Sequence, residues 1–254
     1  MDLSGRTDAL VTEQQLPLEE GLLTAADIVS RTIQPQTSDH TSTVWRVALE
    51  GGLRGYYKAQ ASSPLAVDYG HHPDEVFLND CAAWRLAFGL GRPFSHLAAP
   101  CVVRRIDDEV GSLIAHRSKT DDWVELSELW ERHPDQCRAA ALFDGLIGQQ
   151  DRHDGNYRYD ADRGLIALID HGFAFPAGTE HDQWWFNNSF FVQERWDRDD
   201  QALDEFELAV LRFLLRSPTL FGLDGILDDA RLGRLRERAK FMIDQGRLTD
   251  PGQW

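Results

Sequence analysis

The stretch from Gly148 to Asn156 concentrates side chains that can do chemistry. It reads Gly-Gln-Gln-Asp-Arg-His-Asp-Gly-Asn and follows a helical pattern that ends at Gly148. The polar loop presents the Asp151 carboxylate, the His153 imidazole and the Asn156 amide. Phosphoryl transfer requires a carboxylate or imidazole that orients or deprotonates the attacking hydroxyl. We therefore expect Asp151, assisted by His153, to act on an acceptor hydroxyl.

A further carboxylate follows on a short hairpin. Its predicted strands span 156–159 and 165–170, and residues 160–164 form the turn. Asn156 and Asp170 flank this hairpin, so they converge at its mouth. An amide oxygen and a carboxylate are hard ligands suited to Mg²⁺, which takes its remaining ligands from phosphate and water. The spacing predicts a Mg²⁺ site formed by Asn156 and Asp170, with Mn²⁺ as an alternative ion.

The rest of the chain predicts a β-rich part followed by a mainly helical part, which is an α+β fold. Strand-like stretches cover 27–33, 42–49, 53–59, 99–106 and 110–116, with a helix at 73–91 between the third and the fourth. Further helices are expected at 124–130, 134–147, 203–215 and 228–245. A polar break at 119–122 divides the chain. The predicted organisation is a polar, partly disordered segment 1–20, an N-lobe 21–118 and a C-lobe 119–254.

Whole-chain composition excludes several functional classes. The chain of 254 residues has 26 Lys+Arg and 42 Asp+Glu, so its formal net charge is 26 − 42 = −16. This acidity argues against nucleic acid as the main partner and against a polybasic membrane anchor. No apolar run approaches the roughly 18 residues that membrane insertion needs, and residues 1–20 lack a secretory pattern. The scattered Cys81, Cys101 and Cys137 indicate a reducing, cytoplasmic compartment, where these thiols are small buried hydrophobic groups.

The loop and the hairpin resemble motifs of a known family. Asp-Arg-His-x-x-Asn from Asp151, followed by Ile-Asp-His-Gly-Phe at 169–173, is similar to the catalytic and metal-binding loops of the phosphatidylinositol 3/4-kinase-like branch of the protein-kinase-like fold. The small actinobacterial-type members are the most similar. Ordinary protein kinases carry His-Arg-Asp and Asp-Phe-Gly instead. The resemblance covers about residues 27–175 and implies a two-lobed protein-kinase-like fold that binds ATP and Mg²⁺.

The resemblance also implies roles for residues in the N-terminal half. Lys58, in Gly-Tyr-Tyr-Lys-Ala, matches the strand lysine that holds the α- and β-phosphates of ATP. Asp80 replaces the helix glutamate that pairs with this lysine, with Glu75 as the alternative. The strand at 111–117 matches the one entering the hinge, where backbone groups hold adenine. The loop over the phosphates contains no glycine, and its expected phosphate contacts are Ser38, Thr41 and Ser42.

These residues together predict an ATP- and Mg²⁺-dependent kinase that transfers the γ-phosphate to a hydroxyl group. A Ser or Thr of a protein or peptide is the expected acceptor, because nothing in the sequence indicates the membrane-binding surface that a lipid kinase needs. A small molecule, a lipid, and nucleotide transfer with ATP bound in reverse stay open as alternatives. A non-catalytic nucleotide-binding scaffold, or pseudokinase, is the alternative of another class.

Three further features have structural explanations that we favour over chemical ones. His-rich dipeptides at 71–72, 153–154 and 181–182 suggest a metal-dependent phosphohydrolase, but they fall in polar loops rather than on packed helices. The aromatic group at 184–191 either lines an acceptor site or packs in the core, and large aromatic side chains are mostly buried. The arginine-rich helix at 231–240 has an apolar face, so its charges are expected to face solvent.

Overall fold

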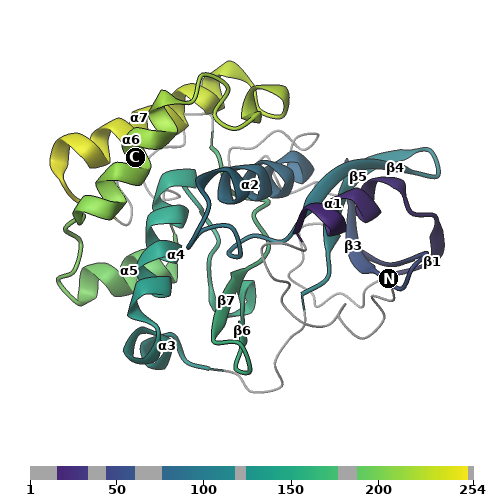
Figure 1. Cartoon of the computed structure of the whole chain (residues 1–254), viewed down its shortest axis with the longest axis horizontal. Helices are drawn as coiled ribbons and strands as arrows, with labels where there is room; N and C mark the ends of the chain where they lie inside the picture. The colour runs from purple at the N-terminus through teal and green to yellow at the C-terminus, as the bar shows by residue number, and fades with distance from the viewer. Residues whose placement is uncertain (1–15, 34–43, 61–75, 118–123, 177–187, 251–254) are drawn as a thin grey trace.

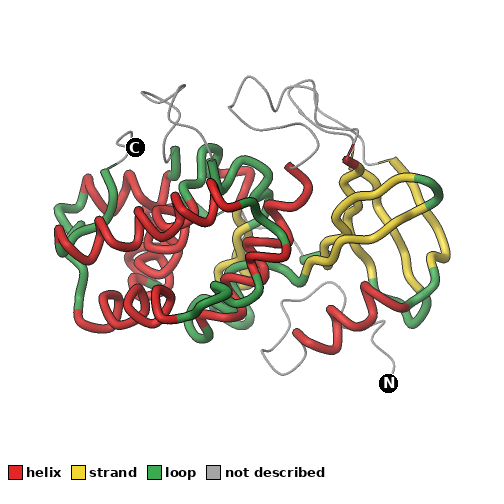
Figure 2. The backbone as a smooth tube through the Cα atoms, turned by 90° about the horizontal axis from the view of Figure 1, so that it is seen from above, coloured by secondary structure: helices red, strands yellow, loops and turns green. Residues whose placement is uncertain are grey.

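The computed structural model describes residues 16–33, 44–60, 76–117, 124–176 and 188–250, which form two lobes (Figure 1). An antiparallel five-stranded sheet of order β1-β2-β3-β5-β4 builds the N-lobe, and the C-lobe is mainly helical with a two-stranded sheet, β6-β7. Figure 2 shows this division of strands and helices. The strands are β1 (Ile28–Ile33), β2 (Val44–Leu49), β3 (Arg54–Ala59), β4 (Cys101–Ile106), β5 (Glu109–Ala115), β6 (Tyr157–Asp160) and β7 (Leu165–Leu168). The helices are α1 (Leu16–Ala25), α2 (Val76–Leu90), α3 (Leu126–Arg132), α4 (Pro134–Ile147), α5 (Phe190–Asp197), α6 (Glu205–Arg216) and α7 (Asp229–Gln245), with short 3₁₀ turns η3 (Asp154–Asn156) and η4 (Leu223–Gly225).

Residues with positive φ form the tight turns between neighbouring strands of the antiparallel sheet. Gly51 and Gly52, each at φ 84°, reverse the chain between β2 and β3, in a conformation that glycine adopts without steric cost. Asp107, at φ 52°, does the same between β4 and β5. The predicted three-stranded meander and the two later strands are confirmed. Since β3 pairs with both β2 and β5, Lys58 lies on the central strand.

The two faces of the central strand have different surroundings. Tyr57 and Ala59 of β3 pack in a buried cluster with Val47 of β2 and Leu113 of β5. Successive side chains of a strand point to opposite faces, so Lys58 faces away from this cluster. Pairing in the sheet therefore leaves the lysine on the face that is open to contacts from other elements.

Helix α1 was not predicted from the sequence. It begins at Leu16, inside the segment 1–20 that the sequence describes as polar. Leu23 is fully buried beneath the sheet, and the Arg104 guanidinium donates to the carbonyls of Leu23 and Ala26 at 2.7 and 2.6 Å. Glu19 and Arg117 form a buried ion pair at 3.1 Å. These tertiary contacts, rather than local periodicity, define the helix.

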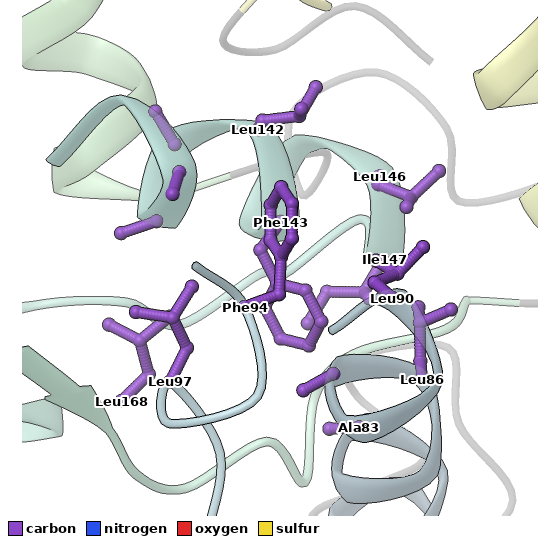
Figure 3. Packing of buried hydrophobic residues seen from close by; sticks show 14 of the residues in the cluster. Ala83, Leu86, Leu90, Phe94, Leu97, Leu142, Phe143, Leu146, Ile147 and Leu168 are labelled. Carbon is purple, nitrogen blue, oxygen red and sulfur yellow. The ribbon is translucent and has the colours of Figure 1, made fainter. Parts of the chain in front are cut away.

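Helix α2 is buried on two sides. Toward the sheet, Cys81 and Trp84 pack with Cys101 at the start of β4, so these cysteines are buried as predicted. On its other side α2 joins the large core of the C-lobe, where it packs against α4 and the chain after α2 (Figure 3). The labelled residues of this contact are Ala83, Leu86, Leu90, Phe94, Leu97, Leu142, Phe143, Leu146, Ile147 and Leu168. This helix is therefore held by both lobes.

Helix α4 lies at the centre of the C-lobe core and has the predicted limits. Pro134 begins it, where a proline costs no hydrogen bond, and Gly148 ends it in a left-handed conformation with φ 62° and ψ 50°. Cys137 and most of its other side chains are buried. The polar loop with Asp151 starts directly after this cap, so α4 fixes where the loop begins.

Helix α7 corrects one expectation. Its apolar residues are buried as predicted, but Arg231 and Arg238 are only 3% and 2% exposed, so the prediction that the charges face solvent is wrong for these two. Arg238 Nε donates to the Leu146 carbonyl at 2.8 Å, near the end of α4, where carbonyls lack helical partners. Hydrogen bonding to such groups offsets the cost of burying a guanidinium.

Two sequence expectations concern the organisation of the whole chain. The lobe boundary placed between residues 118 and 119 falls in 118–123, outside the described residues, and stays a prediction. Within the part of the chain that the structure describes, no helix combines the length and apolar character needed to cross a bilayer.

Candidate active site

Lys58 lies between two carboxylates. Its Nζ donates to Asp170 Oδ1 at 2.7 Å and to Asp80 Oδ2 at 3.0 Å. The Lys58 and Asp80 side chains are 10% and 3% exposed, whereas that of Asp170 is 47% exposed. The shorter Asp80 side chain thus reaches the lysine that the sequence pairs with it. We call Lys58, Asp80 and Asp170 the Lys58 cluster.

The charges of the Lys58 cluster stabilise one another, but they do not sum to zero. Against the effect of burial, the carboxylates of Asp170 and Asp80 raise the pKa of Lys58. Burial alone would raise the pKa of Asp80 and of Asp170, but the Lys58 ammonium lowers both. All three groups are therefore ionised at neutral pH, and two negative charges face one positive charge. Such a site attracts a further cation.

Asp151 and Asn156 lie at the mouth of the β6–β7 hairpin. The Asn156 Nδ2 donates to the Asp151 carbonyl oxygen at 2.7 Å, which leaves Oδ1 as the acceptor side of the amide. The Ile169 N–H donates to the Asn156 carbonyl at 3.0 Å and extends the contact between the hairpin ends to the residue before Asp170. Burial raises the pKa of Asp151, His153 opposes this, and Asp170 adds to it. The structure therefore brings Asp151, Asn156 and Asp170 together, as the sequence predicts.

His153 holds the loop and faces Asp151. Its Nδ1 accepts the Gly155 N–H at 3.0 Å, so the proton of the neutral ring is on Nε2. Nε2 lies 4.0 Å from Asp151 Oδ1, and the side chain is 51% exposed. His153 thus caps η3 through Nδ1 and presents Nε2 at the edge of the site.

Arg152 supports the site, and our sequence reasoning assigned it no role. Its guanidinium is fully buried and binds both oxygens of Asp144 on α4, at 3.0 and 3.2 Å. Its Nη1 donates to the Asn156 carbonyl at 2.7 Å and also to the Ile169 carbonyl. One guanidinium therefore joins the polar loop to the strand that ends before Asp170. Its place between Asp151 and His153 was the available signal.

Ser189 completes the contacts of Asp144. Its Oγ donates to Asp144 Oδ2 at 2.8 Å, and the backbone of Arg152 bonds with Asn188 and Phe190 on either side of it. We call Arg152, Asp144 and Ser189 the Arg152 cluster. Gln149, also missed, donates from Nε2 to the Asp170 carbonyl at 2.9 Å. These polar groups fix the backbone around the site.

The donor set of the site fits a nucleotide-bound Mg²⁺. Among the described residues, no group of three or more His, Cys, Asp and Glu side chains could hold a metal ion. Mg²⁺ does not need such a group, because it is bound through one or two carboxylates together with substrate phosphates and water. Asn156 Oδ1 and Asp170 Oδ2 are suitable oxygens for that arrangement.

Several predicted residues lie outside the described part of the chain. They include the serine-containing loop and the alternative acid, and these predictions stay as they are: Ser38, Thr41, Ser42, Glu75, 71–72, 181–182 and 184–187. Of the remaining aromatic group, Phe191 is fully buried in the C-lobe core, and Phe190 is 40% exposed.

Comparisons with known proteins concern the fold. No protein-family model and no curated protein sequence matches the chain. Among solved structures, the chain is similar to the Golgi casein kinase with Mn/ADP bound, with TM-score 0.58 and 13% identity over 92% of this chain and 76% of that one. It also aligns with the proinflammatory kinase CtkA of Helicobacter pylori (TM-score 0.45, 12% identity, 91% and 95% covered). A third match is the Rio2 kinase of Chaetomium thermophilum, in an ADP/Mg²⁺-phosphoaspartate complex (TM-score 0.38, 10% identity, 91% and 75% covered).

The first of these similarities establishes the class of fold. The chain has the two-lobed protein-kinase-like fold that the sequence predicts, with an antiparallel sheet in the N-lobe and a helical C-lobe. The phosphatidylinositol 3/4-kinase-like branch is not among the similar structures named above and remains a prediction.

Proposed function

We propose that this protein is an ATP- and Mg²⁺-dependent kinase that transfers the γ-phosphate of ATP to a hydroxyl acceptor. The observation that carries the proposal is the contact of Lys58 Nζ with both Asp80 and Asp170 on a protein-kinase-like fold. A lysine paired with a helix carboxylate next to a metal-binding aspartate is the arrangement that positions a triphosphate in this fold.

Nucleotide binding follows from the polarity of the site. Lys58 binds the α- and β-phosphates, and Asp80 keeps its ammonium in place. The strand at 111–117 leads into the hinge, where backbone groups hold the adenine, and the loop with Ser38, Thr41 and Ser42 contacts the phosphates. The excess negative charge of the Lys58 cluster is neutralised when Asn156 and Asp170 hold Mg²⁺, which supplies charge compensation for the phosphate oxygens.

Asp151 is the residue that we assign to the acceptor. Burial raises its pKa, so it accepts a proton more readily than an ordinary aspartate while remaining able to orient a hydroxyl. The His153 Nε2–H, whose nitrogen lies 4.0 Å from Asp151 Oδ1, donates toward the transferred phosphoryl group. Catalysis then consists of positioning and charge stabilisation, with no covalent intermediate on the protein.

The acceptor that we propose is a Ser or Thr hydroxyl of a protein or peptide, in the cytoplasm. The formal net charge of −16 disfavours binding to an anionic membrane, which argues against a lipid acceptor. The motif Asp151-Arg-His-x-x-Asn156 supports a place in the phosphatidylinositol 3/4-kinase-like branch.

The test is a transfer assay with ATP that is radiolabelled on the γ-phosphate, using the purified chain alone and with a cell lysate. We expect label in protein bands that depends on Mg²⁺ and is absent for Lys58→Met. A parallel reaction with ATP labelled on the α-phosphate distinguishes nucleotide transfer. Binding of ATP in a thermal-shift assay without transfer of either label to any acceptor contradicts the proposal and favours a scaffold.

A further inference from the structure

Two successive residues of α2 hold the backbone that follows Asp170. Asp80 Oδ1 accepts the His171 N–H at 2.8 Å, and Asn79 Nδ2 donates to the Gly172 carbonyl at 2.7 Å. Asn79 is fully buried, and Asp80 is 4% exposed. The segment after the metal ligand is therefore fixed at one N–H and one C=O by the same helix.

This fixation matters because of the conformation of Asp170. Its φ of 59° is in the left-handed region, which a non-glycine residue keeps only when its surroundings determine it. Gln149 holds the Asp170 carbonyl from one side, and Asn79 holds the Gly172 carbonyl from the other. The direction of the Asp170 carboxylate thus depends on contacts made by the neighbouring backbone.

Asn79 has a second partner in a distant part of the chain. Arg231 of α7 donates from Nη1 to Asn79 Oδ1 at 3.1 Å, and its Nε binds Asp228 Oδ2 at 3.0 Å. A guanidinium only donates, so it determines which end of the Asn79 amide carries the oxygen. The amide nitrogen is then directed to the Gly172 carbonyl. This contact explains why Arg231 is buried although arginine is mostly exposed.

We propose that Asn79 and Arg231 are positioning residues for the metal ligand Asp170, so that helix α7 sets the metal affinity of the active site. The proposal rests on the proposed function, in which Asp170 holds Mg²⁺. Asn79 acts through the backbone at Gly172, and Arg231 acts through Asn79. Residues of this kind, which orient a ligand without touching the metal, are worth about 10- to 100-fold in metal affinity or activity.

Asn79→Asp separates positioning from folding. The variant keeps the shape of the side chain and an oxygen acceptor for Arg231, but it replaces the donor to Gly172 with a second acceptor. We expect the affinity for Mn²⁺ in the presence of ADP, measured from the free Mn²⁺ signal in electron paramagnetic resonance, to fall about 10- to 100-fold. The new carboxylate is paired with Arg231, so we expect the variant to fold, with a thermal unfolding midpoint lowered by the loss of the bond to Gly172. Arg231→Met, which removes the donor, is expected to lower Mn²⁺ affinity in the same direction.

Two variants on α7 serve as controls. Asp228→Asn removes the ion pair but leaves a good helix N-cap and the bond from Arg231 to Asn79, and Arg234→Ala changes an exposed ion pair. Both are expected to bind Mn²⁺ within about twofold of the unmodified chain, as substitutions away from such contacts do. Unchanged Mn²⁺ affinity in folded Asn79→Asp or Arg231→Met overturns the inference alone. Failure of the unmodified chain to bind Mn²⁺ with ADP overturns the proposed function and the inference with it.

Discussion

The Lys58 cluster and the Arg152 cluster contain similar charged groups. They differ in the charge and the hydrogen-bonding atoms that remain available to a ligand. In the Lys58 cluster, one ammonium faces two carboxylates, and the Asp170 side chain is 47% exposed. In the Arg152 cluster, the Arg152 and Asp144 side chains are completely buried, and the guanidinium also binds two backbone carbonyls. The first cluster has surplus negative charge and an exposed oxygen, whereas the second is closed.

This difference separates binding from support. A closed, hydrogen-bonded ion pair leaves no room for a ligand, and its removal is costly because it leaves a buried charge without a partner. An open cluster with surplus charge can accept a cation and its phosphates. We therefore expect substitutions in the Lys58 cluster to affect activity most, and substitutions in the Arg152 cluster to affect stability most.

Asp170→Asn is expected to have the largest effect on activity. It removes a metal ligand and a negative charge, while asparagine tolerates the left-handed conformation of this position well. Phosphate transfer should fall on the order of 1,000-fold or more, as it does when a preorganised electrostatic contact is lost. The measurement is initial velocity with labelled ATP, with circular dichroism as the check of folding. Activity within tenfold of the unmodified chain would remove Asp170 from the metal site.

Arg152→Met is expected to have the largest effect on stability. Removing one partner of a buried ion pair costs about 3–5 kcal/mol, and Asp144 then lies uncompensated beneath the loop. The measurement is the free energy of unfolding in urea. The double variant Arg152→Met/Asp144→Leu is the matched control, because it removes both charges and should recover part of the loss. A loss below about 1 kcal/mol, which is typical of exposed pairs, would contradict the closed character of this cluster.

Ser189→Ala tests the edge of the same cluster. The substitution removes the bond from Oγ to Asp144 and the cap that accepts the Val192 N–H of α5. We expect a loss of about 1–2 kcal/mol in the free energy of unfolding, since a buried hydrogen bond and a helix cap are each worth about 1 kcal/mol. Ser189→Thr retains the hydroxyl and serves as the comparison. A destabilisation as large as that of Arg152→Met would show that Ser189, rather than Arg152, holds the cluster.

A further expected effect concerns pH and a group in neither cluster. Burial, followed by the charges of Arg54 and Arg46, lowers the pKa of His116 from 6.5 to about 4. Between these two values the unfolded chain binds a proton that the folded chain does not, so stability is lost as pH falls from 6.5 toward 4. The thermal midpoint should therefore fall more in the unmodified chain than in His116→Asn over this range. Equal pH dependence in the two chains would assign the effect to other groups.

The sequence predicted elements whose limits are set by local signals. Pro134 and Gly148 bracket α4 because the first begins a helix and the second ends one, and Gly51 and Gly52 allow one reversal. The convergence of Asn156 and Asp170 was predictable for the same reason, since a short hairpin brings its two ends together.

The remaining features depend on contacts between distant parts of the chain. Nothing local distinguishes Arg231 from an exposed arginine, because its burial results from Asn79 on another helix. Arg152 is likewise a charged loop residue until Asp144 and Ser189 surround it. Helix α1 contains Gly21 and is ordered by its packing on the sheet, which periodicity does not report.

The two-sided burial of α2 has a consequence for how the molecule unfolds. The sheet covers one flank of this helix and the core around Phe143 covers the other, so neither lobe can lose its structure without exposing apolar surface of α2. Shared burial of this kind couples the unfolding of one lobe to that of the other, because each lobe covers apolar surface of the same helix. A fragment that ends at Arg117 would contain α2 but would lack the half of its packing that α4 supplies.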